Sequence, residues 1–152
     1  AYKKALKLTK KYAWDKPSEN PAYGITLTKF GYLKLKEGKL KKAISKIKKG
    51  QKILEKAGHK FWLLTTNLHL AQAYIKKGEL KKAKQIITNE VKICKDNDWY
   101  YRQIQCYLLL LEIDPKRDEL VDKFNETLGK LDSEEVKNRF RKQLKEILNK
   151  DE

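Results

Sequence analysis

The sequence has few of the residues that break helices or cross-link a chain. Its 152 residues include three prolines, seven glycines and two cysteines. So little proline and glycine leaves few turns or long loops and disfavours a fold of many short strands. Cys94 and Cys106 are too few for a disulfide framework, which favours reduced, buried thiols in a cytoplasmic protein.

Long apolar segments are also absent. The longest apolar run covers residues 107–111, whereas a membrane-spanning helix needs about 20 residues. No secretory signal stands at the beginning of the chain. We therefore expect no membrane partner.

Sequence motifs typical of catalysis are missing as well. There is no glycine-rich phosphate loop, no Cys-x-x-Cys pair and no serine nucleophile elbow. His59 and His69 are predicted to lie on different structural elements, and no further ligands are expected to converge on them. We expect a protein that is not an enzyme and that uses no metal and no cofactor.

The sequence contains no methionine and opens on Ala1. Residues 3–8 resemble residues 48–53, which belong to the middle of a repeat's second helix. This pattern predicts that the chain is a piece of a longer protein. The N-terminal helix of the chain then lacks its partner helix and can self-associate through an uncovered apolar side.

A repeat of forty residues is the strongest positive signal. The segment 38–43 reads Gly-Lys-Leu-Lys-Lys-Ala, and 78–83 reads Gly-Glu-Leu-Lys-Lys-Ala, while Leu120 keeps the leucine once more. A fixed period in this range is typical of stacked supersecondary units, which build extended surfaces for partners.

The same offset aligns positions outside these segments. Ile47 aligns with Ile87, Ile53 with Ile93, Gly58 with Asp98, and Phe61 with Tyr101. Glycine and aspartate both tolerate the left-handed backbone that ends helices, so 57–59 and 97–99 are predicted to form equivalent corners. Tyr101 is predicted to lie in the core, and Trp99 and Tyr100 to pack at their corner.

Apolar residues at three- and four-residue steps predict helices along most of the chain. Pro115 fits a first helical turn, and Asp132 with Glu135 resembles a capping box. The resulting organisation is one domain over 1–152, with a partial repeat at 1–13, repeats at 22–57 and 60–97, a degenerate repeat at 99–131 and a closing helix at 132–150.

The second pair of helices reads Leu70-Ala71-x-x-Tyr74-x-x-x-Gly78, with Ala83 five residues later. This pattern resembles the tetratricopeptide repeat, in a variety with a longer repeat of about forty residues. The first pair matches it at Phe30-Gly31, Gly38 and Ala43 but has Lys34 where Tyr74 aligns, and the third departs at Leu111 and Asp118. The resemblance implies an all-α, right-handed array of antiparallel helix hairpins with a C-terminal capping helix.

The resemblance also implies a groove lined by the first helix of each pair. Thr28, Gln72 and Leu108 stand where chaperone-binding members carry basic and amide residues, so an amphipathic helix or a mixed peptide is the expected ligand. The implied lining is Ile25, Thr28, Tyr32 and Leu35, then Thr65, Leu68, Gln72 and Ile75, then Gln105, Leu108 and Glu112.

Positive charge is concentrated in the first part of the chain. Residues 1–60 hold 18 lysines and 4 acids, whereas residues 113–152 hold 10 basic and 11 acidic residues. Lys42, Lys46 and Lys49 recur at helical spacing on a predicted second helix, which the resemblance places on the outer, convex side. This basic stripe fits a solvated face, an acidic partner or a nucleic acid.

The preferred hypothesis is a non-catalytic scaffold that binds a protein or peptide. One alternative is the sensor or scaffold portion of a larger transcription regulator or signalling protein. The other is nucleic-acid binding through the basic N-terminal half, although 32 lysines against 4 arginines favour general electrostatics over base recognition.

Overall fold

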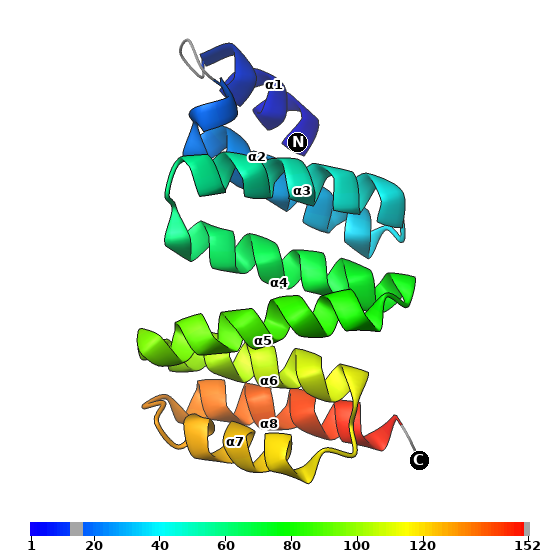
Figure 1. The fold of residues 1–152 in the computed structure, drawn as a ribbon, viewed down its shortest axis with the longest axis vertical. Coiled ribbons are helices and arrows are strands. Elements are labelled where there is room, and N and C mark those ends of the chain that lie inside the picture. Colours follow the sequence, from blue (N-terminus) through cyan, green and yellow to red (C-terminus); the bar gives the residue numbers. More distant parts are fainter. Residues whose placement is uncertain (13–16, 151–152) are drawn as a thin grey trace. The chain divides into compact units, whose positions relative to one another are not determined.

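The computed structural model describes residues 1–12 and 17–150, and within them it is entirely helical (Figure 1). The predicted all-α class is confirmed for this part of the chain, which contains no strand. The helices are α1 (Tyr2–Tyr12), a 3-10 turn η1 (Pro17–Glu19), α2 (Pro21–Lys36), α3 (Leu40–Lys56), α4 (Lys60–Lys77), α5 (Leu80–Asp96), α6 (Tyr100–Ile113), α7 (Asp118–Leu128) and α8 (Glu134–Asn149).

The chain divides into two compact units, Ala1–Glu79 and Leu80–Glu152. In the first unit each helix from α1 to α4 packs on its neighbour in sequence, and α2 also lies beside α4. In the second unit α6 is central and packs against α5, α7 and α8. Helices adjacent in sequence are thus adjacent in space from α1 to α4 and from α5 to α7, whereas α8 returns to pack on α6 (Figure 1).

The predicted turns form as the repeat indicates. Gly38 and Gly78 have φ angles of 76° and 85°, in the left-handed region where a side chain would be strained. The next residue in each turn closes it, since the Lys39 N–H donates to the Lys34 carbonyl at 2.9 Å. Asp98, aligned with Gly58, is the one non-glycine residue of the described chain with a positive φ, at 54°. The predicted equivalence of these two corners is confirmed.

The two helices of the first hairpin approach closely because small residues line their contact. A methyl group added at Gly31 would lie 2.6 Å from Ile47 Cγ1 and 3.0 Å from the Ala43 carbonyl oxygen. Farther along, one added at Gly50 would lie 2.8 Å from the carbonyl oxygen of Gly24. The contact between α2 and α3 is therefore nearly backbone on backbone, which leaves no room for larger side chains.

Apolar side chains on both sides of this contact form the core of the first unit. Leu35, Ala43 and Ala73 make one buried cluster, which brings α2, α3 and α4 together. Tyr23, Leu27 and Ile53 make another. Leu6 of α1 packs against this second cluster, whereas Leu8 is 43% exposed. The apolar side of α1 is therefore covered in part by its own unit.

Three sequence-based expectations are corrected here. Tyr101 is not in the core, since it is 42% exposed, and its aligned partner Phe61 is 48% exposed. The alignment of the two aromatics is right, but both occupy an outward position at the start of a helix. Pro115 lies in the turn before α7, which begins only at Asp118. The cap of α8 is Ser133 and not Asp132.

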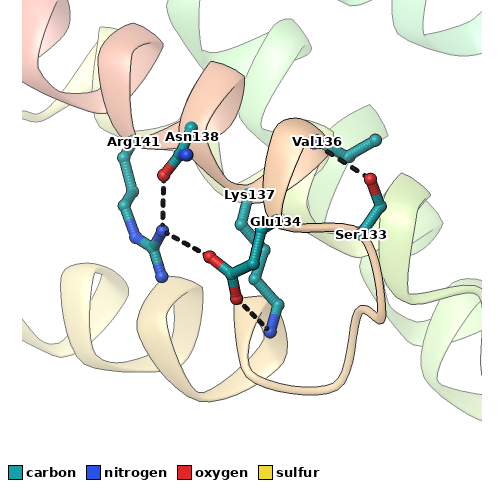
Figure 2. A network of polar contacts seen from close by, with 6 residues as sticks. All are labelled: Ser133, Glu134, Val136, Lys137, Asn138 and Arg141. Carbon is teal, nitrogen blue, oxygen red and sulfur yellow. Dashed lines mark hydrogen bonds and ion pairs between the residues drawn. The ribbon is translucent and has the colours of Figure 1, made fainter.

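Figure 2 shows how the beginning of α8 is held. Ser133 Oγ accepts a hydrogen bond from the Val136 N–H at 3.3 Å, which satisfies a donor that the first helical turn leaves open. Glu134 accepts from Lys137 at 3.2 Å and from Arg141 at 3.4 Å. The hydrogen bond from Lys137, and then the charge of that lysine, lower the pKa of Glu134. This exposed network orders the first turns of α8.

Candidate partner-binding site

The site begins where α2 and α4 meet, because the sequence predicts these as the first helices of consecutive pairs. The hydroxyls of Thr28 and Thr66 lie 3.0 Å apart in the buried contact between them. Each is also within hydrogen-bonding distance of a carbonyl one turn earlier on its own helix, Gly24 at 3.0 Å and Trp62 at 2.7 Å. Thr28 is only 1% exposed, so it fixes the register of the two helices and leaves almost no surface for a partner.

One turn farther along α2, a polar and aromatic cluster reaches the surface. The rings of Tyr32 and His69 stack with their centres 4.1 Å apart. His69 Nδ1 lies 3.2 Å from Gln72 Oε1, and because that oxygen only accepts, the ring nitrogen donates. Lys36 places its ammonium 5.0 Å from the centre of the Tyr32 ring. Tyr32, His69 and Gln72 are all half-buried, so the cluster is ordered and still accessible.

The remaining predicted groove residues of the first unit divide into two groups. Leu35 and Leu68 are buried, with Leu35 in the cluster that joins α2, α3 and α4. Ile25, Thr65 and Ile75 are half-buried and keep part of their surface in water. The side of this unit that carries Tyr32 and Gln72 is thus mixed apolar and polar, and its role in binding stays a prediction.

The second unit carries the three remaining predicted groove residues on α6. Leu108 is buried, Gln105 is half-buried and Glu112 is exposed. Gln105 accepts a hydrogen bond from Arg102 at 2.8 Å, which orients its amide. Of the three, Gln105 and Glu112 offer polar groups to a partner.

The basic stripe on α3 is uneven in its surroundings. Lys42 and Lys49 are exposed, whereas Lys46 is half-buried with its ammonium 5.7 Å from the centre of the Phe30 ring. Such a contact draws the cation to the electron-rich ring face. Two of the three stripe lysines are therefore free to reach a partner, and the third also stabilises the hairpin.

The aromatic residues at the corner before α6 pack where they were predicted. The Tyr100 hydroxyl donates to Asp98 at 3.2 Å, and Lys130 lies over the Tyr100 ring at 5.0 Å. Trp99 is half-buried at the beginning of the same helix. These contacts hold the corner and leave Tyr100 poorly placed to stack on a ligand.

Within the described residues, no three His, Cys, Asp or Glu side chains gather into a group that could hold a metal ion. His59 precedes α4 at the N-cap position but makes no side-chain capping hydrogen bond, and His69 lies in the cluster with Tyr32. None of the described helices combines the length and the apolar character needed to cross a bilayer.

The two cysteines are free, buried and next to each other in the second unit, on α5 and α6. Their mutual hydrogen bond, followed by burial, raises the pKa of Cys106. The same hydrogen bond lowers the pKa of Cys94, and burial opposes that change. A thiol reacts as its thiolate, so a buried thiol with a raised pKa is inert.

We therefore expect the thiols of the folded protein to react slowly with a disulfide reagent such as 5,5′-dithiobis(2-nitrobenzoate) at pH 8, and both to react rapidly in urea. Raising the pH to 9 will accelerate the unfolded chain but barely change the folded one, because both thiols are buried and the reagent cannot reach them. Absorbance of the released thiolate measures both rates. Equal rates with and without urea would contradict the burial of this pair.

Sequence reasoning identified Tyr32 and Gln72 but missed His69, which joins them. The missed signal was local: His69 and Gln72 are three residues apart on one helix and therefore share a face. Comparison with known proteins gives no match, whether to a protein family, to a characterised protein or to a solved structure. The resemblance to tetratricopeptide repeats therefore rests on the residues quoted above.

Proposed function

We propose that this chain is a non-catalytic scaffold that binds a protein or peptide along the first helices of its pairs. In this proposal the helices form a right-handed array of hairpins like that of tetratricopeptide repeats, with α8 as the closing helix. The left-handed glycine turns at 38 and 78 and the close Gly31–Ala43 contact support it.

The observation that carries the proposal is the cluster of Tyr32, His69 and Gln72 on two adjacent first helices. The stacked rings present a rigid apolar surface at low cost in conformational entropy. The Gln72 amide and the Lys36 ammonium beside the rings supply a donor for a peptide carbonyl or carboxylate. A peptide with apolar and polar side chains on the same face fits this combination.

The test is to select peptides from a random display library against the full chain and to measure their affinity for two variants. Gln72→Lys inserts a charge into the cluster, whereas Gln85→Lys makes the same change at an exposed position of α5. Gln72→Lys is expected to weaken the selected peptides about tenfold or more, since it removes the amide and places a mismatched charge under the bound peptide, which costs about 1 kcal/mol or more. Equal affinity for both variants would contradict the proposed surface.

The lysine excess favours a second candidate, an acidic partner or a nucleic acid on the outer face of α3. Replacing Lys42, Lys46 and Lys49 together by glutamate separates the two candidates. Peptides that use the cluster should keep their affinity, whereas a nucleic acid should lose it and should show steep salt dependence in the unchanged protein. Loss of peptide binding in this variant would show that the peptide binds the basic stripe on α3 and not the cluster.

A further inference from the structure

A basic hollow opens in the second unit between α5, α6 and α7. Residues from all three helices line it, and its volume is about 340 Å³. Small-molecule sites usually measure about 300–1,000 Å³, so the hollow suits a small ligand. It lies entirely within residues 88–123 and shares no residue with the cluster of Tyr32, His69 and Gln72.

Four cationic side chains line the hollow. Lys92 and Lys95 come from α5, Arg117 precedes α7 and Lys123 lies on α7. Arg117 is paired with Glu119, which is not part of the lining. Among the described residues Lys92, Lys95 and Lys123 make no ion pair. The lining contains no acidic side chain, so the hollow carries an excess of positive charge.

Apolar side chains make up the rest of the wall. Tyr107, Leu110 and Leu120 are buried, and Val91 is half-buried beside them. Burial raises the pKa of Tyr107, so its phenol stays neutral and adds no negative charge to the site. A ligand that covers this wall removes apolar surface from water, which favours binding.

We propose that the hollow binds a small organic anion with an apolar body, such as a medium-chain carboxylate. Its head group lies among Lys92, Lys95, Arg117 and Lys123, and its body covers Val91, Leu110 and Leu120. The cations favour a ligand with a negative charge. The apolar wall favours a ligand with an apolar body over small inorganic anions. This proposal is independent of peptide binding by the first unit.

Three probes with matched parts test the proposal by calorimetric titration of the full chain at low salt. Decanoate has the charge and the chain, decanol has the chain alone, and inorganic phosphate has the charge alone. Decanoate is expected to bind with one molecule per chain. Decanol and phosphate are expected to bind at least about tenfold more weakly, because decanol lacks the charge and phosphate lacks the apolar chain. No binding of decanoate, or equal binding of decanol or phosphate, would overturn the proposal.

Variants locate the binding. Lys92→Gln with Lys123→Gln should weaken decanoate binding about tenfold, since the two changes remove two of the four cations around the head group. Lys84→Gln with Lys145→Gln removes the same charge from exposed positions outside the lining and should leave affinity within twofold. An equal loss in both pairs would show diffuse attraction by net charge and overturn the proposal.

Thr88 stands on the lining and is exposed, so Thr88→Trp fills the hollow with little effect on the core. This variant should lose decanoate binding while its far-ultraviolet circular dichroism stays helical. A folded Thr88→Trp protein that binds decanoate as the unchanged protein does would place the ligand elsewhere and overturn the proposal.

Discussion

Replacing Phe124 by alanine is expected to lower the free energy of unfolding by about 3–5 kcal/mol. Phe124 lies on α7, is 0% exposed and is the largest of the fully buried side chains in the described chain. Its removal loses the transfer free energy of an aromatic ring and leaves a cavity between packed helices, because α7 packs on α6. Urea unfolding followed by circular dichroism measures the change.

The matched control is the same substitution at a surface position. Phe61 at the beginning of α4 is 48% exposed, and Phe61→Ala should cost less than about 1 kcal/mol because much of the ring is already in water. If the two variants are equally stable, Phe124 is not a core residue. If Phe124→Ala unfolds completely, Phe124→Leu, which fills most of the space, should restore a cooperative transition.

Gly50→Ala is expected to destabilise the first unit by about 1–3 kcal/mol, even though alanine is the better helix former by about 1 kcal/mol. The added methyl group would lie 2.6 Å from Thr28 Oγ1 and 2.8 Å from the Gly24 carbonyl oxygen. The threonine can rotate, but the carbonyl belongs to the backbone of α2 and cannot move without shifting the helix. Steric overlap therefore outweighs the gain in propensity.

A second alanine substitution on the same helix isolates the steric effect. Ser45 is exposed on α3, so Ser45→Ala gains helix propensity without meeting a neighbour and should be neutral or slightly stabilising. Thermal melts of both variants decide the matter. A Gly50→Ala protein that melts at or above the temperature of the unchanged protein would refute the close contact between α2 and α3.

The turns and helices could be predicted because their causes are local. Gly38 and Gly78 adopt a left-handed backbone because glycine has no side chain to strain it. The forty-residue offset relates the left-handed Gly58 to Asp98 in the same way. The outer ends of the predicted repeats, 22–57 and 60–97, lie within about one residue of the ends of α2 with α3 and of α4 with α5. A helix start that depends on one hydroxyl group, such as the Ser133 cap of α8, was harder to predict. Asp132 stands next to it, and aspartate is as good an N-cap residue as serine.

The faces of the helices could not be predicted to the same degree. Tyr101 is apolar and aligned with another aromatic, which suggested the core, yet both positions point outward at a helix start. Thr28 is polar and was assigned to a groove, yet its hydroxyl lies close to Thr66 and Gly24 inside the unit. Which side of a helix meets a neighbour depends on packing between helices, and helical periodicity alone does not specify it.

The basic hollow left no trace in the sequence because its parts come from three helices. Lys92, Arg117 and Lys123 are unremarkable among 32 lysines and 4 arginines, and only the packing of α5, α6 and α7 brings them together. The absence of acids from the lining is likewise a property of the fold, since acids are common in the neighbouring sequence. The net charge of a sequence segment therefore does not predict which charged side chains the fold brings together.

The lysines that lie over aromatic rings have a consequence for the solution around the first unit. Lys29 lies 5.2 Å from the Trp62 ring centre, and Lys36 and Lys46 lie over Tyr32 and Phe30. A ring attracts an ammonium group through its quadrupole but does not neutralise its charge. The balancing negative charge must come from small mobile anions of the solvent. A polyanion that displaces those anions would return them to bulk water, and the entropy gained would shrink as salt is added.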